Sequence, residues 1–413
     1  MDKQGWFEQA RFGMFIHFGS YSVRGMEASW PLAWGQISYT DYVALAERFN
    51  PSRYNPAAWA ALAQAAGVRY AVFTTKHHDG LALFDTQLSD YSTTHRAAGR
   101  DLVAPYVEAF RAAGLKVGFY FSLADWHHPD YPAGISDPTP RHWRPAQALP
   151  PGVPASLEAD PSRWERYLAF MHGQVRELCT NYGTIDLLWF DGQWEHTAAE
   201  WRSAELVQMV RQLQPGIVIN NRLALDNPNL GDYDTPESVV PVAPPARSWE
   251  SCLTINETWA YNPKDRAYKS SGELIQTLAE VVSKGGNLLL GVGPTAEGEI
   301  PVEFESRLRV VGDWLARNGE SIYGAGPGLA PGAYYGPSTS TPAALYLHVV
   351  GYPADGVIRV RGLERRANQV TLLANGAPLE FDQHGGVLEQ GLLRIGLPGR
   401  SGDALTPVIK VSF

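Results

Sequence analysis

Residues 185–192 are Ile185-Asp186-Leu187-Leu188-Trp189-Phe190-Asp191-Gly192, and this stretch decides the fold. Its apolar run is typical of a buried parallel β-strand, and the acid follows the strand at the end where barrel enzymes place catalytic groups. Asp-Gly is also a common turn pair, so Asp191 could equally be a turn or cap residue. The neighbouring Trp189 and Phe190 favour catalysis, because sugar C–H faces stack on aromatic rings. The stretch predicts a carbohydrate-active site with Asp191 as the nucleophile.

Six further strand-like runs alternate with helical patterns along the chain. The strand-like runs cover residues 14–18, 70–76, 117–122, 217–220, about 248–253 and 287–291, and the clearest helical patterns cover 102–113, 161–180, 200–213 and 273–284. This alternation predicts a parallel sheet, and at this length an irregular TIM-like (β/α) barrel over residues 1–324. Seven strands are recognisable, which fits either a partly open barrel or an unrecognised eighth strand.

The pattern changes near residue 325. Residues 324–328 are glycine-rich and read as a linker. Alternating apolar runs separated by glycine-rich turns follow it, at residues 345–350, 357–360 and 370–373. We therefore expect residues 330–413 to form a small C-terminal all-β sandwich, so that the fold class is α/β with an added β domain.

The composition narrows the function classes. The chain has 413 residues with 13 Trp and 19 Tyr, and its net charge of −9 without a basic tract argues against nucleic acid. Cys179 and Cys252 do not form a disulfide framework, and no Cys/His/Asn order supports a thiol nucleophile. No apolar run approaches the ~18 residues of a membrane span. The N-terminus lacks the apolar core of a signal peptide, so we expect a cytoplasmic protein that does not bind membranes.

Three histidines follow strand-like runs and admit two interpretations. His17 follows the first run, and His77 and His78 follow the second. On a strand His77 and Asp79 would share a face, which could make a metal-ligand pair and the chain a metal-dependent TIM-barrel hydrolase. Neutral imidazoles that bond sugar hydroxyls explain the same residues, and we expect neither a metal nor a cofactor.

Glu250, after Trp249, is the candidate second carboxylate. A retaining glycosidase uses an ionised nucleophile and a protonated acid about 5–5.5 Å apart, and two acids at the ends of different strands could reach that separation. Arg222 is either a surface salt-bridge residue or a donor to a sugar hydroxyl or to the nucleophile. Trp126 lies in the long loop 124–160, where it packs the loop or touches substrate. A non-catalytic sugar-binding barrel is a third reading, which the presence of both Asp191 and Glu250 opposes.

Five segments together resemble glycoside hydrolase family 29, the α-L-fucosidases. They are Arg11-Phe12-Gly13-Met14-Phe15-Ile16-His17-Phe18-Gly19 with the preceding Trp6-Phe7, Thr75-Lys76-His77-His78-Asp79-Gly80, Tyr120-Phe121-Ser122-Leu123-Ala124-Asp125-Trp126, Leu188-Trp189-Phe190-Asp191-Gly192, and Gly285-Gly286-Asn287-Leu288-Leu289-Leu290-Gly291-Val292-Gly293-Pro294. The resemblance covers residues 6 to about 323.

This resemblance implies an irregular barrel with a β-sandwich and a retaining exo-hydrolase of terminal α-L-fucosyl residues. The substrate would be a fucosylated oligosaccharide or glycoconjugate, and no cofactor is needed. By motif position Asp191 would be the nucleophile. The residues implied to hold fucose are His17, His77, His78, Trp189 and Arg222, with Tyr120 or Phe121 at the sugar.

The chain departs from the family pattern in the loop after the first strand. Family members commonly have Glu-Trp there, both touching fucose, whereas this chain has Glu27-Ala28-Ser29-Trp30. Ser29 stands where the glutamate would be; Glu27 could reach the site by a loop shift, and Trp34 is a third possibility. An apolar wall of Trp30 or Phe190 would contact the fucose methyl group.

The acid/base varies in position among family members. The Trp249-Glu250 segment matches a motif of many bacterial members, so we assign the role to Glu250, with Glu237 and Glu257 as rivals.

Overall fold

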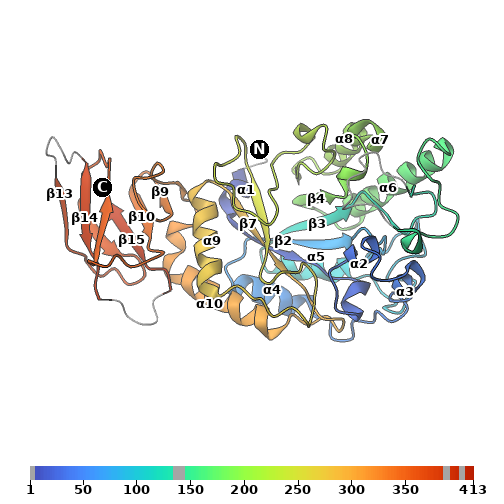
Figure 1. Ribbon diagram of the computed structural model, residues 1–413, viewed down its shortest axis with the longest axis horizontal. Helices are drawn as coiled ribbons and strands as arrows, with labels where there is room; N and C mark the ends of the chain where they lie inside the picture. The colour runs from blue at the N-terminus through green and yellow to red at the C-terminus, as the bar shows by residue number, and fades with distance from the viewer. Residues whose placement is uncertain (1–4, 134–144, 385–390, 400–404) are drawn as a thin grey trace.

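A seven-stranded parallel sheet forms the larger part of the protein, in a computed structural model that describes residues 5–133, 145–384, 391–399 and 405–413 (Figure 1). Its strands are β1 (Phe12–Ile16), β2 (Tyr70–Lys76), β3 (Lys116–Ser122), β4 (Leu187–Asp191), β5 (Val218–Ile219), β6 (Glu250–Thr254) and β7 (Asn287–Val292). Their order across the sheet is β5-β4-β3-β2-β1-β7-β6. The predicted irregular α/β barrel is confirmed.

Helices follow the strands, and the longer ones cover the outer face of this sheet. The longer ones are α4 (Pro56–Ala65), α5 (Val103–Ala112), α6 (Pro161–Asn181), α8 (Ser203–Leu213), α9 (Ser271–Ser283) and α10 (Val302–Asn318), and the short ones are α1 (Gly5–Ala10), α2 (Trp30–Ala33), α3 (Tyr39–Val43) and α7 (Ala198–Trp201). Side chains alternate along each strand. On β4, Leu188 and Phe190 therefore join the core beneath the helices, whereas Leu187 and Trp189 join the core inside the barrel.

A short segment closes the barrel between β5 and β6. Tyr233 forms a parallel bridge with Asn220 at the end of β5, and Asp234 and Glu237 form parallel bridges with the chain at β6. The backbone N–H of Glu250 donates to the carbonyl of Asp234 at 2.9 Å. Residues 233–237, called the seam segment below, thus occupy the place of the eighth strand. The sequence shows no strand pattern here, because Pro236 and the acidic residues interrupt any apolar run.

The helix predicted at residues 200–213 is interrupted. Thr197 and Glu200 form a reciprocal capping box that starts α7 early, at Ala198. Arg202 then adopts a left-handed backbone with φ of 52°, which separates α7 from α8. The helix predicted at 161–180 matches α6, where Asp160 caps the first turn and Pro161 occupies the first helical position.

Two antiparallel sheets follow the barrel and form the β-sandwich. The strands are β8 (Gly326–Pro327), β9 (Ser338–Ser340), β10 (Ala344–His348), β11 (Val357–Val360), β12 (Gln369–Leu372), β13 (Phe381–His384), β14 (Leu392–Gly396) and β15 (Val408–Ser412). One sheet has the order β12-β15-β10-β9-β8 and the other β11-β14-β13. Leu347 and Ile409 from the first sheet pack in one core with Val360 and Ile395 from the second.

The sandwich packs against the barrel at the side of α9 and α10 (Figure 1). The Trp314 indole of α10 donates to the carbonyl of Thr406 at 3.0 Å, and Glu320 pairs with Lys410 at 2.6 Å. The predicted linker at 324–328 falls at this junction, and β8 begins within it.

Candidate active site

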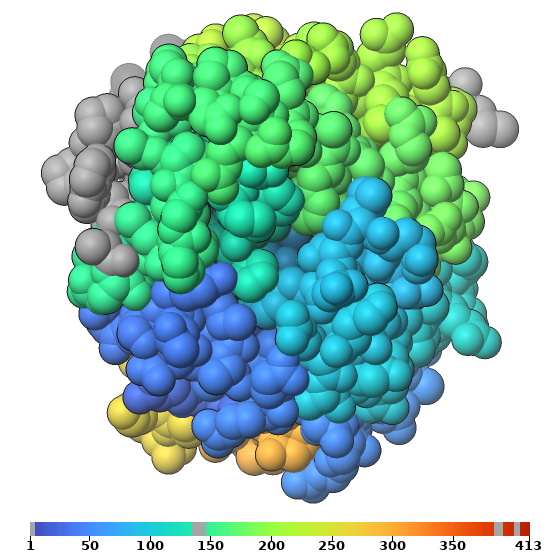
Figure 2. All heavy atoms as spheres, turned by 90° about the vertical axis from the view of Figure 1, so that its right-hand side faces the viewer, coloured from blue at the N-terminus to red at the C-terminus, as the bar shows by residue number. Residues whose placement is uncertain are grey.

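A cavity of about 810 Å³ opens at the carboxyl ends of the barrel strands. Figure 2 faces this end of the molecule and shows it hollowed between the blue and green segments. The strands deliver His17 after β1, His77 after β2 and Asp191 at the end of β4 to its lining, with Tyr120 of β3 and Trp189 of β4 beneath. Parallel strands bring these residues together because their carboxyl ends share one edge.

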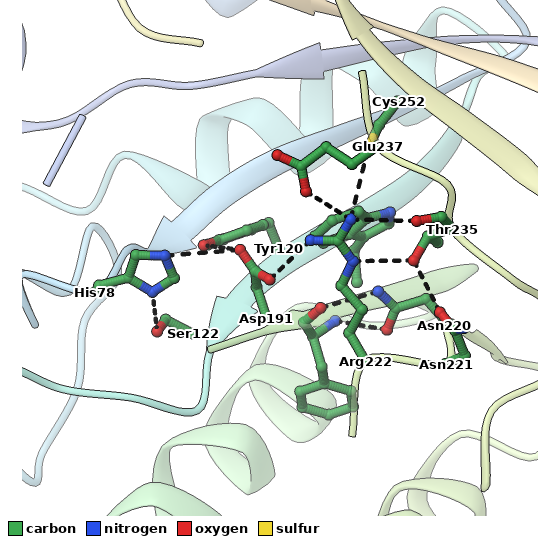
Figure 3. Close-up of polar contacts among 12 residues, drawn as sticks. His78, Tyr120, Ser122, Asp191, Asn220, Asn221, Arg222, Thr235, Glu237 and Cys252 are labelled. Carbon is green, nitrogen blue, oxygen red and sulfur yellow. Dashed lines mark hydrogen bonds and ion pairs between the residues drawn. The ribbon is translucent and has the colours of Figure 1, made fainter. Parts of the chain in front are cut away.

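Asp191 is held by three neighbours (Figure 3). The hydroxyl of Tyr120 donates to Asp191 Oδ2 at 2.9 Å, and Arg222 Nη1 donates to Oδ1 at 3.0 Å. His78 Nε2 lies 3.7 Å from Oδ2, and Ser122 contacts the other ring nitrogen, His78 Nδ1, at 2.7 Å. The Tyr120 and Arg222 donors fix the orientation of the carboxylate.

Arg222 connects Asp191 to a second carboxylate, Glu237. Arg222 Nη2 lies 2.7 Å from Glu237 Oε2, while Nε donates to Thr235 Oγ1 at 3.0 Å. The guanidinium also lies over the Trp189 ring, 4.5 Å from its centroid. Burial acts to lower the pKa of Arg222, but the charges of Glu237 and Asp191 outweigh it and raise the pKa above its usual value. One permanent cation therefore spans the two carboxylates.

The histidines of the cavity are neutral. Burial lowers the pKa of His17 to about 3, and burial together with His78 and His17 lowers the pKa of His77 well below its usual value. The His77 ring stacks on Tyr120 with centroids 5.2 Å apart, and its Nδ1 contacts Ser29 Oγ at 2.7 Å. Neutral rings held in this way can exchange hydrogen bonds with sugar hydroxyls.

His77 and Asp79 have different partners, contrary to a shared metal. His77 lines the cavity, whereas Asp79 Oδ2 accepts from the Tyr42 hydroxyl at 2.9 Å. Within residues 5–133, 145–384, 391–399 and 405–413, no group of three or more His, Cys, Asp or Glu side chains has an arrangement suited to a metal ion. Nothing in this geometry favours the metal-dependent hydrolase.

Glu250 does not reach the cavity, contrary to its predicted role as acid/base. Its side chain is fully buried inside the barrel and does not line the cavity. Its carboxylate accepts hydrogen bonds from the Tyr70 hydroxyl and from Trp189 Nε1, the latter at 3.0 Å. Burial raises the pKa of Glu250 to about 7, a value suited to a general acid. However, a carboxyl sealed from the cavity cannot protonate a leaving group there. Of its two rivals, Glu257 is exposed away from the cavity and Glu237 lines it.

Glu27 is also not among the residues that line the cavity. Both of its carboxylate oxygens accept from the backbone N–H of Trp259, at 3.0 and 2.8 Å. Trp259 does line the cavity, and its ring lies 5.2 Å from that of His17. Glu27 therefore acts on the site through Trp259, while Ser29 contacts His77.

Of the remaining aromatic residues predicted for the site, some line the cavity and others are buried behind its lining. Trp30 lines the cavity, as does Trp34. Trp126 is buried and packs against Trp30 and His78, and its indole N–H donates to Glu195 at 2.8 Å. Phe190 points to the face of β4 opposite to that of Trp189 and lies beneath the helices. The prediction that it contacts a sugar methyl group is therefore wrong.

Two lining tryptophans, Trp194 and Trp259, were missed in the sequence. Trp194 lies just after the Asp191-Gly192 turn, in the 3₁₀-helix Gln193–Glu195. Gly192 has a left-handed φ of 77°, which turns the chain back toward the cavity. Closeness in the sequence to Asp191 was an available signal for Trp194. For Trp259, the only signal in the sequence was its position after β6.

Comparison with known proteins gives concordant results. A family model described as α-L-fucosidase matches residues 1–320. An α-L-fucosidase of Dictyostelium discoideum is 29% identical over 390 residues, covering 86% of this chain and 79% of the relative. The structure of α-L-fucosidase isoenzyme 1 from Paenibacillus thiaminolyticus superposes with a TM-score of 0.88 at 39% identity, covering 100% of this chain and 98% of the other. A family 29 α-L-fucosidase from Bacteroides thetaiotaomicron, in a trapped covalent intermediate structure with 2-fluoro-fucosyl fluoride, gives a TM-score of 0.87 at 26% identity, covering 100% and 96%.

Proposed function

The chain belongs to the α-L-fucosidase family of glycoside hydrolases, and on that premise we propose that it releases terminal α-L-fucosyl residues with retention, through a covalent fucosyl-enzyme. The observation that carries the proposal is the pair of carboxylates, Asp191 and Glu237, joined by Arg222 at one cavity. The trapped intermediate of the Bacteroides enzyme supports a covalent route. The substrate class is a fucosylated oligosaccharide or glycoconjugate.

Asp191 attacks the anomeric carbon in the first step. Its carboxylate is oriented by Tyr120 and Arg222, so little reorganisation is needed when the C–O bond forms. The bond to the leaving oxygen breaks as a proton is delivered to that oxygen. Trp189 stacks on Tyr120, with centroids 5.6 Å apart, and the two rings form the floor on which the sugar would rest.

Glu237 supplies that proton, and in the second step it activates water to cleave the fucosyl-enzyme. Its side chain is 41% exposed at the cavity, which gives it access to the leaving group and to water. It is carried by the seam segment, across Arg222 from Asp191 (Figure 3). This assignment replaces Glu250, whose carboxylate has no path to the leaving oxygen.

The test of this function is the product formed by an Asp191→Ala variant. Toward an aryl α-L-fucoside the variant should lose at least about 10³-fold in kcat, or ~4 kcal/mol, while remaining folded. With an α-fucoside donor, added azide can enter the face that the Asp191 carboxylate has vacated. The product should then be the β-fucosyl azide.

Asp186→Ala is a suitable control, because Asp186 precedes the same strand but lies at the opposite end and pairs with Lys116. It should keep wild-type kcat. An Asp191→Ala enzyme with more than about a tenth of wild-type kcat, a loss under ~1.4 kcal/mol, would refute the nucleophile.

A further inference from the structure

Three indoles form one wall of the cavity. The rings of Trp30 and Trp34 lie 5.9 Å apart and are inclined by 22°, and those of Trp30 and Trp194 lie 5.9 Å apart and are inclined by 18°. Trp30 begins α2 and Trp34 follows its last residue, so their spacing of four places both on one face. The three rings are close to parallel, and all of them line the cavity. We call this set the tryptophan wall.

The wall leads from the reacting carboxylate toward solvent. Trp30 contacts the ring of His78, which in turn lies 3.7 Å from Asp191. At the other end, half of the surface of Trp34 is exposed. Ligand pockets are lined mainly by apolar and aromatic side chains, and Trp34 presents such a ring to solvent at this cavity.

The cavity is larger than one deoxyhexose requires. Cavities of ~300–1,000 Å³ enclose drug-sized ligands, and this one measures about 810 Å³. Leu225, which is 59% exposed, and Pro228 add further uncharged lining from the loop after β5. The cavity therefore has room for part of the leaving group.

The charges of the cavity favour a neutral leaving group. Among the described residues that line it, the Asp, Glu, Lys and Arg side chains are Asp191, Arg222 and Glu237. Arg222 is paired with both carboxylates, so its charge is already balanced. An acidic sugar would meet Glu237 without a free cation to offset the repulsion.

We propose that the exposed face of Trp34 binds the sugar ring attached to the fucosyl unit, and that this ring is a neutral pyranose. The apolar C–H face of such a ring stacks on the indole, while its hydroxyls remain in water. The inference rests on the proposed function, because it places the leaving group of that reaction.

The experiment compares two substrates that share the fucosyl unit. α-L-Fucosyl fluoride has no leaving-group ring, whereas α-L-fucosyl-(1→2)-galactose has a neutral pyranose. Trp34→Ala should lower kcat/KM for the disaccharide about tenfold more than for the fluoride, mainly through KM. Trp34→Phe, which keeps a ring, should recover most of that difference. Tyr335→Ala is the matched control, because Tyr335 is 51% exposed but lies on the sandwich, away from the cavity.

The outcomes separate the inference from the function beneath it. Equal effects of Trp34→Ala on both substrates, or none on the disaccharide, would overturn the Trp34 site even if wild-type enzyme hydrolyses the fluoride. Failure of folded wild-type enzyme to hydrolyse fucosyl fluoride would refute the proposed function and this inference together. A 3-O-sulfated galactose in place of galactose should lower wild-type kcat/KM; an acidic ring accepted as well as the neutral one would refute the charge preference.

Discussion

The indole N–H of Trp189 donates to the buried carboxylate of Glu250, with Nε1 3.0 Å from Oε1. Trp189 also lies under the guanidinium of Arg222, so this bond fixes the floor of the cavity from inside the barrel. Glu250 thereby holds the ring on which the Arg222 guanidinium rests. Its role is to position Trp189.

Glu250→Gln should change the pH dependence of stability. Burial raises the pKa of Glu250 in the folded protein to about 7, from an ordinary value of 4.5. Between these values the folded protein holds a proton that the unfolded chain has lost, so this group's contribution to stability is full below pH 4.5 and is lost as pH rises toward 7. The loss amounts to about 3 kcal/mol. The free energy of unfolding of wild type minus that of Glu250→Gln, measured in urea, should fall over this interval. A constant difference would contradict the shift.

Glu237→Ala should impair poor leaving groups far more than good ones. Protonation matters little for a dinitrophenyl or fluoride group, so kcat/KM should fall at least about 100-fold more for a natural fucoside. Azide should accelerate the variant and give α-fucosyl azide, because it attacks the intermediate from the vacated side. Glu257→Ala, an exposed acid outside the cavity lining, is the control. Equal losses for both kinds of substrate would remove Glu237 from the role.

Glu27→Ala should loosen the Trp259 side of the cavity. The change leaves the Trp259 N–H without its acceptor, which typically costs ~1–3 kcal/mol when the group is buried. We expect a lower Tm and a higher KM with fucosyl fluoride, at little change in kcat. Glu27→Gln retains an acceptor oxygen and should behave almost as wild type. If Glu27→Gln is as impaired as Glu27→Ala, the charge itself contacts substrate and the positioning role is wrong.

His77→Ala should weaken substrate binding without changing the limbs of the pH–kcat profile. Because burial, His78 and His17 keep the pKa of His77 well below its usual value, the ring is uncharged at neutral pH. Loss of its hydrogen bonds should raise KM about tenfold, or ~1.4 kcal/mol, and leave the limbs of the pH–kcat profile in place. Chelator should not affect the wild type. Activity that is lost to chelator and restored by zinc would instead favour the metallohydrolase.

The sequence predicted well where one strand carried the whole signal. The apolar run before Asp191 fixed the strand, its carboxyl end and its alternation, and the structure places Asp191 and Trp189 at the cavity accordingly. The same alternation, applied strictly, excludes Phe190. The signal for His17 and His77 was equally local, because each follows its own strand.

The sequence was misleading where position depends on distant partners. Glu250 and Glu237 are both acids near the sixth strand. Only the pairing of the seam segment with β6 decides that Glu250 is buried inside the barrel and that Glu237 lines the cavity. Glu27 meets Trp259 across 232 positions of sequence, a contact that no local pattern encodes. The resemblance supplied Trp249-Glu250 as a motif, but a motif can mark a structural carboxylate as readily as a catalytic one.

The seam segment makes the two carboxylates of the proposed catalytic pair unequal in rigidity. Asp191 ends a strand paired with β3 along its full length, whereas Glu237 belongs to a piece of chain attached at a few isolated bridges. Fluctuations of the barrel should therefore be largest at the seam segment, and they should vary the distance between the carboxylates of Asp191 and Glu237. In hydrogen–deuterium exchange the amides of Asp234, Thr235 and Glu237 should exchange before those of β3 and β4. A covalent cross-link between the seam segment and β6 that slowed this exchange would show whether turnover depends on the motion of the segment.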